Sequence, residues 1–427
     1  MKEITVVVVG AGSRGSTYAR FSKDLPQVKI VAVAEPNEES RRRFASEYSL
    51  QPENVFQDWQ SLAQHGRVAD VAIVATQDSM HRDSAVALLD QGYHMLLEKP
   101  LAPHLRDCEE IIDAANRNGK IFAVCHVLRY TDYSRKLKEI IDSGEIGEIV
   151  SIQHLEPVVW WHQAHSFVRG HWRNEEESSF MLLAKSCHDI DWLLFMLNRR
   201  CERVSSFGNL THFRKECRPE GAAERCLDCS IERSCPYSAK RIYLDDSHNT
   251  GWRDWPLTAV TPDVTEAGIL TALQEGPYGR CVYSCDNDVV DHQVVNFEFE
   301  GGRTASFTMT AFAPAINRCT RFFGTHGYIE GDSNNIRIYD YLTGWKPTID
   351  INQLDGTISG GHGGGDQRMV EAFFRAVAEN NQAYILSGAS ASLESHRVVF
   401  SAEQARKEGR VISISQKSVP MGVDSVR

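Results

Sequence analysis

Two short segments carry lysine, histidine and carboxylate side chains at spacings that suit proton transfer. One is the tripeptide Glu98–Pro100, and the other runs from Lys185 to Asp191 with a histidine near its centre. In a helix, Lys185, His188 and Asp191 would fall near one face, because residues three or four apart are neighbours. A histidine beside a lysine and a carboxylate can act as an acid–base group near neutral pH. The alternative is a histidine at the edge of the core that bonds backbone.

Lys99 follows a predicted strand. Residues 93–97 form a short run after Gly92, so Lys99 would stand just past the carboxyl end of a strand, the edge at which open parallel sheets bind ligands. Pro100 fixes the backbone there and prevents a simple continuation of strand or helix. Taken alone, the tripeptide has a plainer interpretation as a solvated Glu98–Lys99 pair in a loop.

The start of the chain predicts a dinucleotide site. An apolar run at 4–9, typical of a strand buried on both faces, leads directly into the motif Gly10-Ala11-Gly12-Ser13-Arg14-Gly15. The first glycine permits a tight turn, the second lets backbone approach a pyrophosphate, and the third lets helix pack on strand. Glu35 lies twenty residues after Gly15, the spacing of the acid that bonds a ribose 2′-hydroxyl. That carboxylate favours NAD over NADP, although arginines at 41–43 follow closely.

Strand and helix patterns alternate over the first 125 residues. Apolar runs at 28–34, 68–75 and 120–125 alternate with helical patterns at 38–48, 81–91 and 105–118. Such β-α units predict a doubly wound parallel sheet, a Rossmann domain, whose strand ends would converge on the nicotinamide half of the cofactor. The predicted cofactor-binding residues are Gly10, Gly12, Ser13, Arg14, Gly15, Glu35, Thr76, His81, Glu98 and Lys99.

Four cysteines lie close together in a polar insert over about residues 213–262, which shows no hydrophobic core of its own. They are Cys217, Cys226, Cys229 and Cys235. A C-x2-C step lets two thiolates share one metal ion, and two further cysteines complete a tetrahedron. We therefore expect a structural zinc ion. An iron–sulfur cluster, disulfides and free thiols are the alternatives.

The amino-acid composition indicates the broad class of protein. The 427 residues exceed the size of one core, which predicts two domains, and 42% hydrophobic and 24% charged residues are ordinary for a soluble protein. A net charge of −11 argues against a nucleic-acid partner. Neither a signal-peptide pattern nor a membrane-spanning apolar run is visible. The eleven cysteines are then expected to be reduced and the location cytoplasmic.

These motifs resemble those of one family. The glycine motif, Ala75-Thr76 with His81, and Glu98-Lys99-Pro100 are similar to those of the glucose–fructose oxidoreductase, inositol dehydrogenase and rhizopine catabolism (Gfo/Idh/MocA) family. The resemblance implies a Rossmann domain over residues 1–125 and a second domain over 126–427 with an open, mainly antiparallel sheet. In the family the bare face of that sheet commonly packs against another subunit, so a homodimer or homotetramer is expected. The family's Lys-Pro bond is often cis.

The family's second motif reads Asp-x-Gly-x-His-x-x-Asp. This chain matches it at His188 and Asp191 but has Ala184 and Ser186 in place of the first Asp and the Gly. In the family's dehydrogenases the missing carboxylate helps to orient or deprotonate the sugar alcohol, and Lys185 is the candidate to replace part of that role. The resemblance thus implies Lys99, His188 and Lys185 as catalytic residues.

Aromatic, imidazole and guanidinium side chains crowd residues 160–174. Sugars bind aromatic faces with polar groups at the rim, so this segment is a plausible substrate wall. The alternative is a loop packed on a dimer surface. The predicted substrate-binding residues are His126, Arg129, His165, Trp172, Arg173 and Asp191.

Three functions fit these residues. The leading hypothesis is NAD-dependent hydride transfer to or from a sugar or sugar derivative, in which Lys99 bonds the reacting oxygen and His188 handles the proton. A second is an NAD-dependent glycosidase or lyase that oxidises the sugar only transiently, which the Ala184 departure favours. A third is a catalytically silent sugar–NAD sensor, against which Lys99 and His188 argue.

Overall fold

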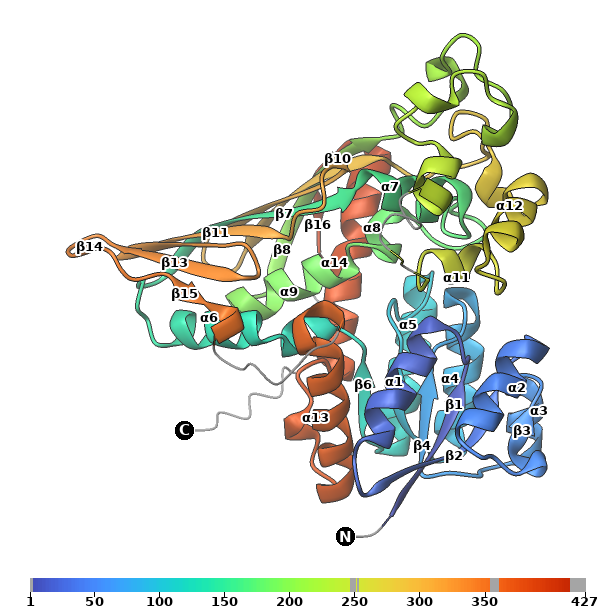
Figure 1. The fold of residues 1–427 in the computed structure, drawn as a ribbon. Coiled ribbons are helices and arrows are strands. Elements are labelled where there is room, and N and C mark those ends of the chain that lie inside the picture. Colours follow the sequence, from blue (N-terminus) through green and yellow to red (C-terminus); the bar gives the residue numbers. More distant parts are fainter. Residues whose placement is uncertain (1–2, 246–250, 252, 354–360, 415–427) are drawn as a thin grey trace.

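The computed structural model describes residues 3–245, 251, 253–353 and 361–414, and it consists of two domains (Figure 1). The first is built on a parallel sheet of six strands in the order β3-β2-β1-β4-β5-β6. Its elements are β1 (Ile4–Val9), α1 (Ser13–Lys23), β2 (Val28–Ala34), α2 (Glu38–Glu47), β3 (Val55–Phe56), α3 (Trp59–His65), β4 (Val71–Val74), α4 (His81–Asp90), β5 (His94–Leu97), α5 (Leu105–Asn118) and β6 (Phe122–Val124).

The central strands of this sheet are apolar because helices cover both of their faces. All four residues of β4 and the last four of β1 are fully buried. A strand in this position cannot show polar alternation, since neither side meets water. The predicted Rossmann domain is confirmed.

The second domain contains a ten-stranded, mainly antiparallel sheet. Only the pairing of β7 with β10 is parallel among its described ladders. Its strands are β7 (Ile149–Val159), β8 (Cys201–Asn209), β9 (His292–Phe299), β10 (Arg303–Ala313), β11 (Cys319–Gly324), β12 (Gly327–Gly331), β13 (Asn335–Asp340), β14 (Gly344–Trp345), β15 (Ile349–Asp350) and β16 (Ile412–Ser413).

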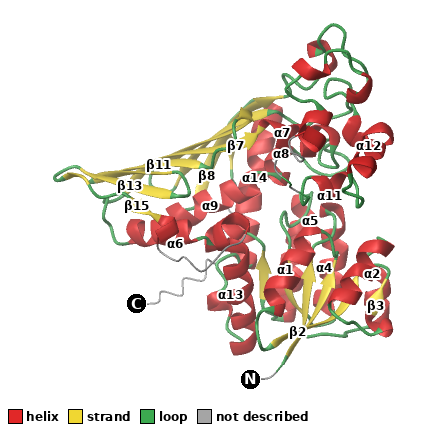
Figure 2. Ribbon diagram, in the orientation of Figure 1, coloured by secondary structure: helices red, strands yellow, loops and turns green. Residues whose placement is uncertain are grey.

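Helices cover one face of this sheet and leave the other bare (Figure 2). The covering helices are α6 (Asp132–Asp142), α8 (Met181–Ala184), α9 (Cys187–Leu197) and α14 (Ala389–Glu408). Along β10, alternate residues from Ala305 to Ala313 are buried and the intervening residues are not, and Ala305, Phe307 and Met309 pack into the core that these helices share. This period of two is what a half-covered strand requires. The predicted open sheet is confirmed.

The C-terminal part of the chain returns to the first domain. Helix α13 (Gly365–Glu379) packs beside α1, and its Phe373 and Phe374 belong to the core that β1 and β2 form. Leu393 of α14 likewise joins the core beneath α5. Helices α13 and α14, which follow the second sheet in the chain, thus contribute side chains to the core of the first domain.

An insert of short helices and turns lies between β8 and β9 and projects from the rest of the molecule (Figure 1). It contains α11 (Leu257–Val260) and α12 (Glu266–Glu275), and thus extends past the predicted limit at about residue 262. The prediction that it lacks a hydrophobic core is wrong. Phe213, Tyr237 and Tyr243 are buried together there, and such scattered aromatic residues have no periodicity that a sequence could reveal.

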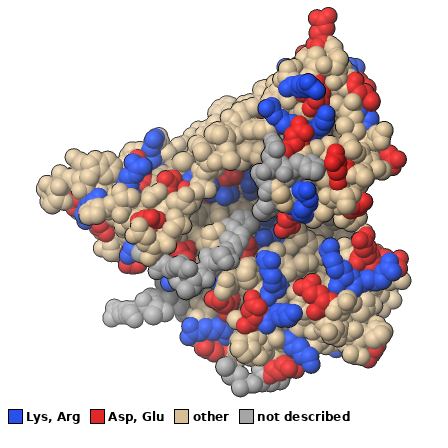
Figure 3. Space-filling view, viewed as in Figure 1, with Lys and Arg blue, Asp and Glu red and all other residues tan. Residues whose placement is uncertain are grey.

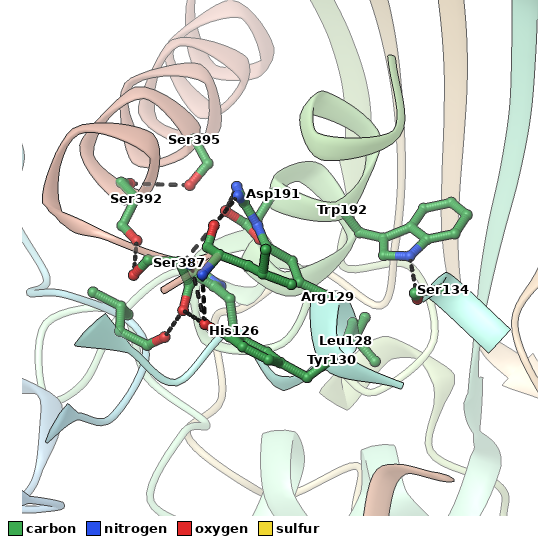
Figure 4. Close-up of polar contacts among 12 residues, drawn as sticks. His126, Leu128, Arg129, Tyr130, Ser134, Asp191, Trp192, Ser387, Ser392 and Ser395 are labelled. Atoms are coloured by element: carbon green, nitrogen blue, oxygen red, sulfur yellow. Dashed lines mark hydrogen bonds and ion pairs between the residues drawn. The ribbon is translucent and has the colours of Figure 1, made fainter. Parts of the chain in front are cut away.

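One buried ion pair connects segments that are distant in the sequence. Arg129 follows β6, and its Nε and Nη2 donate to the two carboxylate oxygens of Asp191 on α9, both at 2.7 Å (Figure 4). Its Nη1 donates to the carbonyl of Leu386, just before α14. Burial would raise the pKa of Asp191, but the charge of Arg129 lowers it below its ordinary value. Two predicted substrate-binding residues are thus bonded to each other.

Arg129→Ala should lower the free energy of unfolding by about 3–5 kcal/mol, because it leaves the buried Asp191 carboxylate without its partner. Arg173→Ala is the matched control. Arg173 pairs with Glu177 and Asp286, whose side chains are 55% and 53% exposed, so its loss should cost less than about 1 kcal/mol. Denaturant titrations of both variants measure the difference. Equal, small losses would show that the Arg129 pair does not hold the segments together.

Candidate functional site

The glycine motif forms a cradle at the start of α1. A side chain on Gly10, whose φ is +91°, would meet the Ala75 carbonyl at 2.4 Å, and one on Gly15 would lie 1.9 Å from the Gly10 carbonyl. Gly12 differs, since nothing lies within 4 Å of where its side chain would be. No side chain caps α1, so its first N–H groups are available to a phosphate. Open space at Gly12 beside an uncapped helix start fits a pyrophosphate.

Glu35 lies at the end of β2 and faces this cradle. Its carboxylate accepts hydrogen bonds from the backbone N–H of Ala11 at 2.7 Å and of Asn37 at 2.8 Å. Each carboxylate oxygen keeps a lone pair for a further donor, such as a ribose hydroxyl. Arg41 bonds the backbone carbonyls of Glu35 and Pro36 and not the carboxylate, so the negative charge of Glu35 remains.

A network around Arg14 joins the cradle to the Lys99 tripeptide. The Nε of Arg14 donates to Glu98 at 2.7 Å, and its guanidinium also bonds Asp366 in the first turn of α13. The hydroxyl of Tyr18 donates to the same Glu98 oxygen at 2.7 Å. Burial would raise the pKa of Glu98, but the charges of Arg14 and Lys99 lower it below its ordinary value. Glu98 therefore stays ionised and holds the loop after β5. Ser13, beside Arg14, is the first residue of α1.

His81 ties two strand-end loops together. It is fully buried, with Nδ1 2.8 Å from the carbonyl of Pro100 and Nε2 3.2 Å from the carbonyl of Thr76. Both ring nitrogens are thus engaged with backbone. The side-chain oxygen of Thr76 is buried and has no hydrogen-bond partner within the described residues. His81 positions the site, while Thr76 retains bonding capacity for a ligand.

Lys99 reaches across to the second domain. The Lys99–Pro100 bond is cis, as in the family, and the Nζ of Lys99 donates to the carbonyl of Ala184 at 2.7 Å. Ala184 ends α8, and α9 begins only at Cys187, so its carbonyl lies where the helix is interrupted. Carbonyls at a helix end need partners from outside the helix. The predicted continuous helix is therefore broken at Lys185 and Ser186, and the break receives the lysine.

Three buried histidines, His188, His126 and His396, have neighbouring rings. The ring of His126 is 5.9 Å from that of His188, edge to face, and 5.6 Å from that of His396. Burial chiefly lowers the pKa of His126 to about 4 and that of His396 to about 3, so both are neutral at pH 7. Neither ring nitrogen of His126 has a hydrogen-bond partner among the described residues, and the nearest carboxylate oxygen, on Asp191, is 3.6 Å away. His126 is fully buried, so this neutral imidazole lies within the protein interior.

A cavity of about 370 Å³ opens on the other side of the α8–α9 break. Its wall includes Glu156 of β7, His162, Lys185, Trp192 and Arg318. The Nζ of Lys185 lies 3.1 Å from Glu156, and the Nε of Arg318 lies 2.8 Å from the same carboxylate. Figure 3 shows the molecule hollowed between the two domains, with lysine and arginine side chains inside. A small polar molecule would meet both charges and hydrogen-bonding groups here.

The buried carboxylate of Asp189 contacts two residues of the cavity wall, Arg318 and His154. Asp189 accepts from Arg318 at 2.5 Å and lies 2.9 Å from Nε2 of His154. Full burial would raise the pKa of Asp189, but Arg318 and His154 hold it below its usual range. Burial lowers the pKa of His162 well below its ordinary value, and the charge of Lys185 adds to this. The cavity therefore presents a neutral imidazole beside paired charges.

None of the six residues predicted for substrate binding lines this cavity, and neither does Lys99 or His188. His165 is buried against the insert, where its Nδ1 lies 2.8 Å from the hydroxyl of Tyr243 and its ring stacks on Tyr278. Trp172 packs on the core of the second domain and against His171. Arg173 forms exposed ion pairs with acidic residues. The aromatic segment 160–174 thus contributes to the cavity wall through His162.

Sequence reasoning did not single out Glu156 or Arg318, whereas His162 belongs to the segment predicted as a substrate wall. The sequence does contain a signal for Glu156. His154, Glu156 and Val158 alternate on one face of β7, and polar residues on a buried face are uncommon. Arg318 gives no such signal. It comes opposite Glu156 only because β11 pairs antiparallel with β7 in the register Thr320 to His154.

The predicted four-cysteine metal site does not form as predicted. The thiol of Cys217 donates to the carbonyl of Thr211 at 3.3 Å. Cys226, Cys229 and Cys235 line a small cavity without it. Within the described part of the chain, no group of three or more histidine, cysteine, aspartate or glutamate side chains is placed to hold a metal ion. Neither zinc nor an iron–sulfur cluster is supported for the predicted set.

Substitutions at Gly15 and Gly12 should have different effects, one on stability and the other on cofactor binding. Gly15→Ala should lower the free energy of unfolding by about 2 kcal/mol or more, because its methyl group meets backbone. Gly12→Ala should change it by less than about 0.5 kcal/mol. It should nevertheless weaken NAD binding at least tenfold, since the methyl group fills the approach to the pyrophosphate. Thermal unfolding and calorimetric titration with NAD give the two readouts. Unchanged NAD binding by Gly12→Ala would contradict the cradle.

Comparisons with known proteins agree with this architecture. Residues 4–126 match the model of an oxidoreductase family with an NAD-binding Rossmann fold, Gfo/Idh/MocA, and residues 138–414 match that family's C-terminal alpha/beta domain. The chain is 26% identical over 379 residues to YteT of Bacillus subtilis strain 168, which is described as an oxidoreductase, covering 83% of this chain and 81% of that protein.

Two further relatives match over shorter stretches. A 2,7-anhydro-N-acetylneuraminate hydratase of Mediterraneibacter gnavus is 28% identical over 213 residues, 50% of this chain and 54% of its own length. An inositol 2-dehydrogenase of Salmonella typhimurium is 32% identical over 143 residues, 33% of this chain and 42% of its own. No helix of the described residues is long and apolar enough to cross a membrane. The two family models together span most of the sequence, and the chain belongs to the Gfo/Idh/MocA family of NAD-binding oxidoreductases.

Proposed function

We propose that this oxidoreductase transfers a hydride between NAD and a carbon bearing a hydroxyl group on a sugar or sugar derivative. The observation that carries the proposal is the position of Lys99. It follows the strand end beside the nucleotide cradle, and its amine bonds the carbonyl of Ala184, the residue before Lys185 of the cavity wall. Lys99 thus lies between the cradle and the second domain. Two relatives that act on a cyclic polyol and on a sugar derivative support the substrate class.

In this proposal each residue has a separate task. Bound NAD would accept the hydride from the substrate carbon. The amine of Lys99 would donate a hydrogen bond to the reacting oxygen and stabilise the negative charge that develops on it. His188, 7% exposed and in ring contact with His126, would take the hydroxyl proton, so that the carbinol becomes a carbonyl. Glu35 favours NAD over NADP through its free negative charge.

Glu156 would supply the carboxylate that Ala184 lacks. Its side chain lies in the cavity wall and is held between Lys185 and Arg318. A carboxylate fixed by two cations can accept hydrogen bonds from substrate hydroxyls without rearrangement. Held in this way, it would orient the sugar. Lys185 would in turn contribute a donor from the same pair.

A second candidate function has one specific observation in its favour. One relative is named as a hydratase, and this chain lacks the carboxylate at position 184. A carbonyl formed transiently on the ring would acidify the neighbouring C–H bond, so a leaving group could depart or water could add. The hydride would then return from NADH to the same carbon. Such a reaction consumes no net NAD, whereas a dehydrogenase accumulates NADH.

Lys99→Ala should lower kcat by about 100-fold or more, because one donor to a developing oxyanion is worth this much. The affinity for NAD should stay within about threefold, since the cradle is intact. The assay is NADH absorbance with a panel of cyclic polyols, aldoses and uronic acids, run beside a glycoside-cleavage assay. Lys136→Ala is the control, as this lysine pairs with Glu139 on the surface of α6. Undiminished activity of the Lys99 variant would sink the proposed role, and cleavage without NADH would favour the second function.

The bare sheet face is proposed to bind a second copy of this chain. At one end it carries exposed apolar residues on the β13–β14 hairpin, with Leu342 96% and Trp345 57% exposed. A homodimer or homotetramer would cover them. The double variant Leu342→Asp/Trp345→Asp should therefore run as a smaller species in light scattering after gel filtration. Met80→Asp, on an exposed residue of the first domain, should leave the mass unchanged. A monomeric wild-type protein would refute this interface.

A further inference from the structure

We propose that the insert binds one zinc ion through Cys226, Cys229, Cys235 and Cys281. These four thiols come from segments separated by up to about fifty residues, and all of them line one cavity of about 20 Å³. This set differs from the one that the spacing suggests, because Cys281 takes the place of Cys217. The proposal is independent of the reaction that the enzyme catalyses.

Backbone pairing places Cys226 and Cys281 on one face of an antiparallel bridge. Arg225 and Arg280 form this isolated bridge, and the N–H of Cys281 donates to the carbonyl of Glu224 at 2.8 Å. Each cysteine follows a bridge partner, so the two lie diagonally across the bridge, about 7–8 Å apart on the same face. Cys229 follows in a tight turn, its N–H donating to the carbonyl of Cys226 at 3.3 Å. The C-x2-C step of zinc sites is thus present beside a third, distant ligand.

A buried cation adjoins these thiols. Arg169 is 1% exposed, and it donates to the carbonyls of Tyr237 and Arg280, both at 2.8 Å. Its Nη2 also lies 3.5 Å from the sulfur of Cys226. Burying a guanidinium is costly unless negative charge is close, and carbonyls provide only partial charge. Four thiolates around a divalent ion carry a net charge of about −2, which a neighbouring arginine would balance.

Cys226, Cys229, Cys235 and Cys281 border one small cavity. As they are placed, the described thiols do not surround a common point. Each cysteine has one side-chain torsion, so rotation about it can turn the sulfur inward while the backbone stays. Zinc accepts four thiolates in a tetrahedron at about 2.3 Å.

The proposed ion would connect the insert to the cavity wall. Arg169 ends the π-helical segment Gln163–Arg169, which directly follows His162. The ring of His162 packs edge to face against Trp255 of the insert, 5.0 Å between centroids. The metal would therefore fix the insert on the side that holds His162 in place. Its role is structural, since four thiolate ligands leave no open position for chemistry.

Metal analysis of the full-length protein tests the ligand set. Protein purified without chelator should contain about one zinc per chain, and Cys217→Ser should retain it. Cys281→Ser should fall below about 0.2 equivalents, because three thiolates bind the ion far more weakly. Loss of zinc from Cys217→Ser with retention by Cys281→Ser would overturn this set. Wild-type protein with no zinc, or with iron in its place, would overturn the proposal.

A spectroscopic measurement keeps the test decisive if Cys281→Ser fails to fold. X-ray absorption at the zinc edge should show four sulfur neighbours at about 2.3 Å in wild type and, equally, in Cys217→Ser. Fewer than four sulfurs in the Cys217 variant would show that Cys217 is a ligand and that the proposed set is wrong.

Discussion

The candidate site depends on the charge of one guanidinium, that of Arg14. Its carboxylate partners come from the loop after β5 and from the first turn of α13, which are far apart in the sequence. Because Glu98 is buried and ionised, it can remain in place only while Arg14 balances it. Arg14 belongs to the glycine motif, so the cofactor cradle and the loop that carries Lys99 are fixed by the same interaction. This also explains why α13 must return to the first domain.

Paired charges give the cavity its chemical character. Lys185 and Arg318 share Glu156, and Arg318 also reaches Asp189, so each of these cations already has a carboxylate. A ligand that carried its own carboxylate would have to displace one of these partners. A hydroxyl group can instead add to the pairs as donor or acceptor, because it brings no net charge. Lys185, with its side chain 21% exposed, remains accessible from the cavity.

The sequence predicted those parts of the site that depend on local chemistry. The glycine motif, Glu35 and Lys99 lie at strand ends, and the spacing of buried strands determines where strand ends fall. The sequence could not predict the contacts that depend on pairing between distant segments. Arg129 and Asp191 were predicted to bind substrate, yet they bond each other, since only the fold brings α9 to the residues after β6. Glu156 and Arg318 meet through one strand register, and Cys281 meets Cys226 through one isolated bridge.

The break in the backbone helix after Ala184 bears on the departure from the family motif at this position. An aspartate there would place its carboxylate near Lys99, whereas alanine offers no side-chain acceptor. In this chain the helix is interrupted after Ala184, and the freed carbonyl accepts the lysine amine instead. A carbonyl carries only a partial charge, so it orients the amine while leaving most of its positive charge for a reacting oxygen. On β7, Glu156 is held by two cations, Lys185 and Arg318, and it is the carboxylate that the proposed mechanism uses in place of the missing one.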